Sequence, residues 1–177
     1  VAEAGGRAVI LQADLSVPVG AMRLMSEYGA AFGRMDALVN NAGIVDRAAR
    51  VEEMTAERLT RMFAVNLTAP FLLAGHAARR MSTRHGGSGG VIVNVSSIAA
   101  RLGSGGQYVD YAASKAGLDA LTKGLAGEVA AEGVRVLSVR PGLVDTAIHG
   151  KGGEPERALR LADLIPMRRP RTARGIA

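Results

Sequence analysis

The sequence predicts an α/β fold built on a parallel β-sheet. Short runs rich in Val, Ile and Leu alternate along the chain with longer Ala- and Leu-rich segments of helical period, a pattern typical of repeated βα units. The short runs are apolar almost throughout, as expected of strands that helices cover on both faces. We therefore expect a layered sheet rather than a bundle or a sandwich.

These patterns predict alternating strands and helices in chain order. In the helix predicted at Thr55–Met81, Thr55 is a suitable N-cap residue, and Pro70 should kink or interrupt the helix. The Gly86–Gly90 stretch contains G-x-S-x-G but precedes a strand, so it is read as a loop and not as a nucleophile elbow. The expected strands are Ala8–Gln12, Ala37–Asn40, Val91–Val95 and Val134–Val139, and the expected helices are Pro18–Phe32, Thr55–Met81, Tyr108–Glu132 and Glu154–Leu164.

Length and composition limit the class of protein. The chain has 177 residues, 48% of them hydrophobic, which suits one domain and excludes disorder for most of its length. It has no cysteine, which excludes disulfides and thiolate sites and is compatible with the cytoplasm. No apolar run reaches the roughly 18–20 residues of a membrane span, so no membrane partner is expected.

Charge and histidine content point to no further partner class. The formal net charge is +6, with arginines concentrated near the C-terminus. Aromatic residues make up only 3% of the chain and no nucleic-acid-binding motif accompanies the charge, so we expect no nucleic-acid partner. The three histidines, at 76, 85 and 149, lie far apart in the sequence, and no metal site is expected.

The stretch from Val91 to Lys115 carries the clearest chemical pattern. Tyr111 and Lys115 are four residues apart at the start of a predicted helix, so they share one helix face. A nearby ammonium favours the phenolate and makes a tyrosine a credible general acid and base. Tyr108 lacks such a partner, because Ala112 stands four residues after it. A serine of the pair Ser96-Ser97, at the end of the preceding strand, could hold a substrate oxygen beside the tyrosine.

Two further motifs follow predicted strands. Asn40 ends one strand and is followed by Asn41, Ala42 and Gly43, where small residues allow a flat ligand to approach closely. The last strand is followed by Arg140–Thr146, which turns the chain toward the same ligand-binding edge of the sheet.

Together these residues resemble the short-chain dehydrogenase/reductase family. The resemblance rests on six motifs in family order: Asp14-Leu15, N-N-A-G at 40–43, Asn66, Ser97, Y-A-A-S-K at 111–115, and P-G-L-V-D-T at 141–146. It implies a Rossmann-type fold, with a three-layer, doubly wound parallel sheet, and NAD or NADP as cofactor. It also implies a homodimer or homotetramer.

The resemblance also implies a role for each residue. Tyr111 would be the general acid/base, Lys115 would bind the ribose and lower the pKa of Tyr111, and Ser97 would orient the substrate oxygen. Asn66 would support a water-linked proton relay to Lys115. The cofactor-binding set would be Asp14, Leu15, Asn41, Ala42, Gly43, Tyr111, Lys115, Pro141, Gly142, Val144 and Thr146.

The sequence departs from the family in two respects. The glycine-rich T-G-x-x-x-G-x-G loop that would hold the pyrophosphate is not found, so the 177 residues are expected to be a single but incomplete dinucleotide-binding domain. In the family order, two strands would separate Ala8–Gln12 from Ala37–Asn40 and leave the first of these runs without a pairing partner. In addition, Ser97 lies one residue farther from Tyr111 than is usual in the family, and Ser96 is the alternative.

The predicted function is interconversion of a secondary alcohol and a ketone, with a sugar dehydrogenase-like or 3-oxoacyl reductase-like substrate. Substrate choice would reside in the Ile98–Gln107 loop and in Gly142–Pro166. Two alternatives stay open, namely a non-catalytic dinucleotide-binding or regulatory protein and an inactive remnant.

Overall fold

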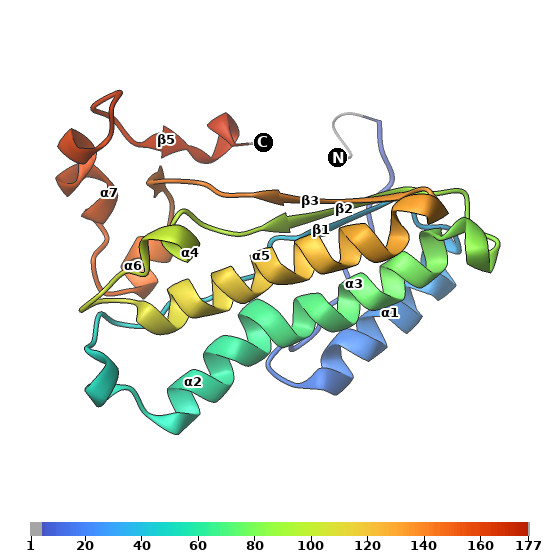
Figure 1. Ribbon diagram of the computed structural model, residues 1–177, viewed down its shortest axis with the longest axis horizontal. Helices are drawn as coiled ribbons and strands as arrows, with labels where there is room; N and C mark the ends of the chain where they lie inside the picture. The colour runs from blue at the N-terminus through green and yellow to red at the C-terminus, as the bar shows by residue number, and fades with distance from the viewer. Residues whose placement is uncertain (1–4, 177) are drawn as a thin grey trace.

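Three of the predicted apolar runs form one parallel sheet. The computed structural model describes residues 5–176 and places β1 (Ala37–Asn40), β2 (Gly90–Val95) and β3 (Val134–Val139) side by side in that order (Figure 1). In the register, Val93 of β2 lies opposite Val39 of β1 and Leu137 of β3. The predicted α/β class and parallel sheet are confirmed.

Three long helices lie on one face of this sheet (Figure 1). They are α1 (Pro18–Phe32), α3 (Ala69–Met81) and α5 (Val109–Val129). Helices α3 and α5 contact the strands, and α1 packs against α3. On the covered face Ile92 is fully buried, whereas Val39 is 59% and Leu137 48% exposed on the other face. The described residues therefore contribute the sheet and one helical layer of the doubly wound arrangement. Within residues 5–176 no helix is both long and apolar enough to cross a bilayer.

The second predicted helix is interrupted where proline was expected to disturb it. The helix α2 (Ala56–Phe63) begins after Thr55, whose side chain accepts a hydrogen bond from the Arg58 N–H at 3.2 Å. A π-helical turn at Ala64–Thr68 then leads into α3, with Pro70 in its first turn. Proline has no N–H and cannot continue the ordinary i→i−4 hydrogen bonds. The π-helical turn just before it changes this pattern, because the Ala69 N–H donates to the Ala64 carbonyl.

The C-terminal region is broken into short elements. The predicted helix Glu154–Leu164 forms only one α-helical turn, α7 (Arg157–Arg160), and a 3-10 turn at Ala162–Leu164. A second pair of parallel strands joins β4 (Val144–Asp145) to β5 (Arg171–Thr172). The remaining short elements are α4 (Ala99–Leu102), α6 (Ile148–Lys151) and 3-10 turns at Val51–Glu53, Thr83–His85, Ala130–Glu132 and Ala173–Gly175.

The strand predicted at Ala8–Gln12 is wrong. Residues 6–14 form neither helix nor strand, and Ile10 is 96% exposed. A β-strand requires a neighbour for its backbone N–H and C=O groups, and no strand in the described part of the chain pairs with this segment. Composition alone therefore overstated the tendency of this run to form a strand.

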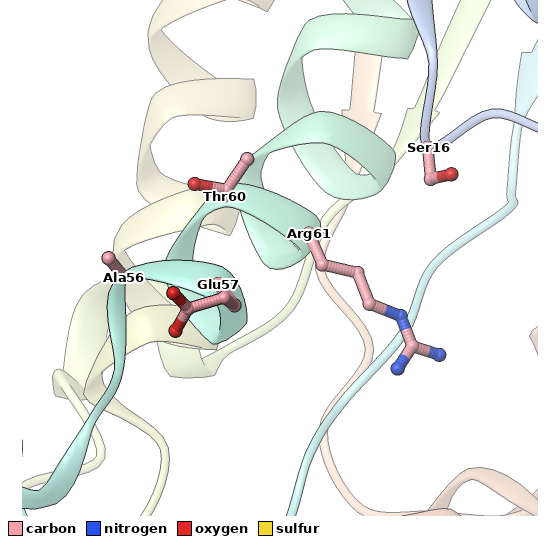
Figure 2. A pocket seen from close by; sticks show the side chains of 5 residues that line it. All are labelled: Ser16, Ala56, Glu57, Thr60 and Arg61. Atoms are coloured by element: carbon pink, nitrogen blue, oxygen red, sulfur yellow. The ribbon is translucent and has the colours of Figure 1, made fainter.

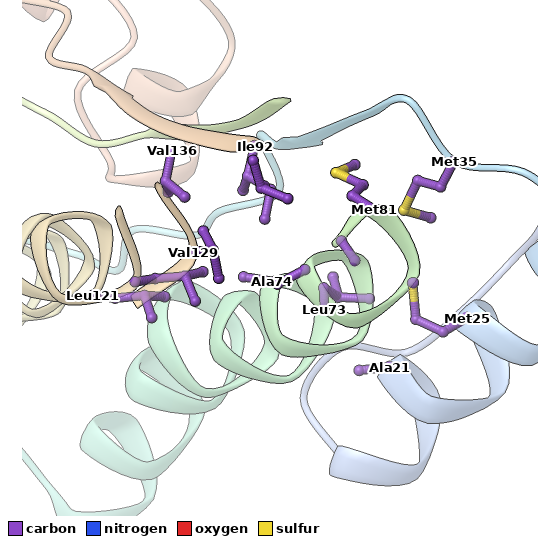
Figure 3. Close-up of a cluster of buried hydrophobic side chains, with 14 of the residues drawn as sticks. Ala21, Met25, Met35, Leu73, Ala74, Met81, Ile92, Leu121, Val129 and Val136 are labelled. Carbon is purple, nitrogen blue, oxygen red and sulfur yellow. The ribbon is translucent and has the colours of Figure 1, made fainter. Parts of the chain in front are cut away.

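The hydrophobic core lies between the sheet and the three long helices (Figure 3). Met81 at the end of α3 and Ile92 in β2 are both fully buried in it. Met35, just before β1, and Met25 of α1 extend the core toward the N-terminal helix. Alanines at 74, 77 and 78 allow α3 to lie close to its neighbours.

Replacing Met81 with alanine should lower the free energy of unfolding by about 2–5 kcal/mol, because the surrounding core cannot fully close the cavity. Met22→Ala is the matched control, since Met22 also lies in a helix but is 54% exposed. Its effect should stay within about 0.5 kcal/mol. Urea unfolding of both variants measures the difference, and equal losses would contradict the core assignment.

Candidate active site

The carboxyl ends of the three strands bring the predicted motifs to one edge of the sheet. Asn41–Gly43 follows β1, Ser96 and Ser97 follow β2, and Pro141 follows β3 by one residue. The loops are joined by hydrogen bonds from the Ser96 N–H to the Val139 carbonyl at 2.8 Å and from the Ile98 N–H to the Pro141 carbonyl at 3.0 Å. This is the edge at which open α/β sheets bind ligands.

A buried chain of polar side chains supports the first of these loops. Asn40 donates to Asn94 Oδ1 at 2.9 Å, Asn94 donates to Thr122 Oγ1 at 2.9 Å, and Thr122 donates to the Leu118 carbonyl at 2.8 Å. The chain ties the end of β1 to helix α5 through the sheet. Sequence reasoning missed Asn94 and Thr122, although an asparagine inside an otherwise apolar strand was a usable signal.

Asn66 holds the segment that follows Gly43. Its side chain accepts a hydrogen bond from the Ile44 N–H at 2.8 Å and donates one to the Ile44 carbonyl at 2.9 Å. It also donates to the Ser114 hydroxyl at 3.1 Å. A Cβ atom on Gly43 would stand 3.4 Å from Lys115 Nζ and 3.5 Å from Asn66 Oδ1. Asn66, Gly43 and Lys115 are therefore brought together.

Lys115 is a buried cation. Its residue is only 4% exposed, and Nζ donates to the Val95 carbonyl at 2.8 Å. Burial lowers the pKa of Lys115 to about 8, against a smaller opposing effect of the Asp119 carboxylate. Nζ lies 5.8 Å from the centre of the Tyr111 ring, so the spacing of four does place the two side chains near each other.

Burial raises the pKa of Tyr111, and a hydrogen bond with the Ser97 side chain opposes that rise. The Lys115 ammonium group donates its hydrogen bond to the Val95 carbonyl while it lies beside the Tyr111 ring. The structure places Ser97, and not Ser96, beside the tyrosine. Ser96 is buried and donates instead to the Lys115 carbonyl at 3.2 Å, where it holds the helix.

The predicted cofactor residues fall into two groups. Leu15, Asn41 and Ala42 line one cavity of about 290 Å³ between α1 and β1. Asp14, the residue before Leu15, is exposed, and its carboxylate accepts hydrogen bonds from the N–H and hydroxyl of Ser16. These bonds lower the pKa of Asp14. A side chain at Gly20 would collide with the Asp14 carbonyl at 1.8 Å, so glycine is needed there.

The second group follows β3. Pro141 contacts the serine loop through its carbonyl, as described above, and Gly142 is exposed. Val144 lies in β4, where its carbonyl is 2.9 Å from His149 Nε2, and Thr146 is exposed at the start of the next turn. This group lies along the chain between β3 and α6, and β4 within it contacts α7.

A larger hollow, of about 420 Å³, contains none of the predicted site residues. It is lined by Ser16 and by residues of α2, namely Ala56, Glu57, Thr60 and Arg61 (Figure 2). Within residues 5–176, no group of three or more His, Cys, Asp or Glu side chains is arranged to hold a metal ion.

Comparison with known proteins identifies the family. The model of the short chain dehydrogenase family matches residues 1–157. The chain belongs to this family. It is 49% identical over 177 residues to the uncharacterized oxidoreductase YgfF of Escherichia coli K12, and 34% identical over 161 residues to the glucose and ribitol dehydrogenase of Daucus carota. The chain spans 72% of the length of the first relative and 53% of the second.

Solved structures of short-chain dehydrogenases have the same fold. A putative NAD(P) dependent gluconate 5-dehydrogenase from Beutenbergia cavernae, with bound NADP at low occupancy, matches with a TM-score of 0.85 and 37% identity over 97% of this chain and 67% of its own. A short chain dehydrogenase from Burkholderia cenocepacia in complex with NADP matches with a TM-score of 0.86 and 30% identity over 99% of this chain and 68% of its own. The predicted family, the Rossmann-type fold and the oxidoreductase class are confirmed.

Proposed function

We propose that this chain carries the catalytic residues of an NAD(P)-dependent oxidoreductase that interconverts a secondary alcohol and a ketone. The observation that carries the proposal is the convergence of Ser97, Tyr111 and Lys115 at the ligand-binding edge of the sheet, with the lysine buried. A protein that only bound a dinucleotide would not need a buried acid/base pair. The 177 residues belong to a single dinucleotide-binding domain.

In the proposed reaction Tyr111 exchanges the proton of the substrate oxygen. It takes the hydroxyl proton when an alcohol is oxidised and returns one when a ketone is reduced. The Ser97 hydroxyl donates a hydrogen bond to the same oxygen and orients it. The nicotinamide supplies or accepts the hydride. Lys115 keeps a positive charge close to the phenol, which favours the phenolate as the proton leaves, and Asn66 supports the proton path to Lys115 and keeps the Ile44 segment in place.

The residues present fit such a cofactor. Leu15, Asn41 and Ala42 surround one cavity, and Gly43 leaves room beside the Lys115 ammonium group. Asp14 and Leu15 would contact the adenine end, whereas Pro141, Gly142, Val144 and Thr146 would contact the nicotinamide end. The NADP in the two related structures supports NAD or NADP as the cofactor, without a preference for either.

A polyol, sugar or sugar acid is the substrate class that the relatives support best. Their names include glucose, ribitol and gluconate. The region that would enclose the substrate is also polar: Arg157 donates to Gln107 Oε1 at 2.7 Å and to Glu154 Oε1 at 3.0 Å. A 3-oxoacyl thioester, with a longer apolar chain, is the second candidate.

The test is turnover of purified protein with NAD⁺ and NADP⁺, using glucose, gluconate and ribitol as alcohols, and with NADH and NADPH, using a 3-oxoacyl thioester as the ketone. Formation or loss of reduced nicotinamide is followed by absorbance. We expect turnover with at least one polyhydroxylated substrate. Dinucleotide binding without turnover of any substrate would favour the non-catalytic alternative, and absence of both would favour the inactive remnant.

We also propose that the protein acts in the cytoplasm as a homodimer or homotetramer. Helix α5 presents small exposed residues to solvent, which would allow close packing of helices from two copies. They are Ala113, Ala116, Ala120, Gly124 and Gly127. Light scattering of the purified protein measures the mass of the assembly, and a monomer would contradict this part of the proposal.

A further inference from the structure

A buried ion pair lies directly before Tyr111. Arg58 of α2 donates from Nε to Asp110 Oδ2 at 2.7 Å and from a terminal nitrogen to Oδ1 at 3.2 Å. The Asp110 side chain is completely buried and that of Arg58 is 13% exposed. By contrast, the Arg34–Asp36 pair lies on the surface with both side chains more than half exposed. The Arg58–Asp110 pair thus differs from an ordinary surface salt bridge.

The pair is attached to the backbone of Tyr111. Asp110 Oδ1 also accepts a hydrogen bond from the Tyr111 N–H at 2.9 Å. That N–H belongs to the first turn of α5, where the backbone lacks acceptors within the helix. On the other side, the Ser114 hydroxyl donates to the Tyr111 carbonyl at 2.7 Å. Side chains therefore fix both backbone polar groups of Tyr111.

Arg58 extends the same network to the loop after β1. Its second terminal nitrogen donates to the Arg47 carbonyl at 2.8 Å. One guanidinium therefore joins three segments: α2, the first turn of α5, and the stretch that follows the Asn41–Gly43 motif. Such a planar group with several donors fixes geometry in a way that a lysine or an apolar contact does not.

Stability alone does not account for this arrangement. Burying two charges carries a desolvation cost that their attraction often only offsets, and an apolar pair of similar volume can be equally stable. An ion pair with all of these hydrogen bonds does, however, define the position of its neighbours closely. Displacing a catalytic group by about 1 Å can cost on the order of 100-fold in rate.

We propose that Arg58 and Asp110 are positioning residues that hold Tyr111 at the correct place relative to Ser97 and Lys115. This inference rests on the proposed function of Tyr111. Neither residue touches the reacting atoms, so both act through the backbone of the tyrosine and through the first turn of α5.

The test is a double-mutant cycle with Arg58→Met, Asp110→Asn and the combined variant. Each single change should lower kcat roughly 10- to 100-fold while KM for the alcohol and the Kd of the cofactor stay near their wild-type values. The combined variant should lose little more than either single one, because both changes remove the same interaction. Amide hydrogen exchange of Tyr111, which does not depend on turnover, should become faster in the Asp110→Asn variant.

Glu132→Gln provides the matched control. Glu132 is also partly buried and accepts from the Ser82 hydroxyl, and it pairs with Arg84 at the opposite end of the sheet. This variant should lose stability without losing kcat.

Tyr111→Phe is measured in parallel. If it is inactive while Asp110→Asn and Arg58→Met keep the wild-type kcat, the positioning role is overturned. If Tyr111→Phe itself turns over normally, the proposed function fails first.

Discussion

Replacing Tyr111 with phenylalanine should lower kcat by about 10²–10⁴-fold, the range that a general acid/base contributes. The variant loses only the hydroxyl, and the aromatic ring remains to fill the same buried space. Cofactor affinity should therefore change little. Single-turnover measurements with a saturating cofactor, combined with a fluorescence titration of NADH and NADPH, separate the two effects.

The other two tyrosines supply the controls for this experiment. The Tyr28 hydroxyl donates to the Arg34 carbonyl just beyond the end of α1, and its ring is kept in the variant, so Tyr28→Phe should leave kcat unchanged. The Tyr108 hydroxyl donates to Glu154 Oε1 at 3.1 Å, and burial raises its pKa. Ala112, and not a lysine, stands four residues after Tyr108, and the cation beside its ring is the Arg157 guanidinium, 5.0 Å from the ring centre. A loss of turnover in Tyr108→Phe larger than that in Tyr111→Phe would transfer the acid/base role to Tyr108.

The pH dependence follows from the same proton transfer. Alcohol oxidation requires Tyr111 as the base, so its rate should rise as pH increases through the pKa of the tyrosine. Ketone reduction requires the protonated form and should slow over the same interval. Because burial raises the pKa of Tyr111 in the free protein, the rise in oxidation should lie toward the alkaline side, and it should be limited where Lys115 loses its charge, at a pKa of about 8. Both pH dependences should be absent from the residual activity of Tyr111→Phe.

The sequence predicted best those helices and strands whose residue pattern is enough to determine them. It predicted poorly the segments whose structure depends on a partner elsewhere in the chain. The bounds of α1 and β3 agree with the predicted Pro18–Phe32 and Val134–Val139, because period and burial determine such elements. Ala8–Gln12 has an equally apolar sequence but forms no strand. A strand depends on a partner elsewhere in the chain, and composition contains no information about that partner.

The site shows the same division. The spacing of Tyr111 and Lys115 predicted their proximity, because four residues return to the same face of a helix. The partner of Lys115 was not predictable, since the Val95 carbonyl that it contacts lies twenty residues away across the fold. Asp110 and Arg58 are 52 residues apart, and nothing in the sequence pattern of either residue indicates a pair. Side chains that act through contacts between distant parts of the chain can therefore be identified only from the structure.

Lys115→Met should lower kcat on the order of 100-fold, because the positive charge that favours the tyrosine phenolate is removed. The methionine side chain has a similar length and suits the buried position. Lys123→Met is the matched control, since Lys123 lies on the same helix but is exposed, and it should keep full activity. Equal kcat values for the two variants would contradict a role for Lys115.

The same substitution also predicts a change in stability that depends on pH. The pKa of Lys115 is lowered from 10.5 to about 8 by burial, so the unfolded chain binds a proton more tightly than the folded protein. Below about pH 8 the folded state therefore bears the full free-energy cost of burying the charged ammonium group. The penalty is relieved as pH rises toward the unfolded pKa of 10.5. A shift of this size corresponds to about 3 kcal/mol.

Urea unfolding at a series of pH values tests this prediction. Relative to Lys115→Met, the wild-type protein should gain about 3 kcal/mol between neutral pH and pH 10.5. The hydrogen bond to the Val95 carbonyl is lost in the variant at every pH. It therefore shifts the difference in unfolding free energy by a constant and leaves the dependence of that difference on pH unchanged. A flat difference would mean that the ammonium group is well solvated in the folded protein. If the difference in unfolding free energy rises with pH and the variant also loses turnover, the buried charge costs stability and serves the reaction. An apolar side chain would be more stable at the same position at neutral pH.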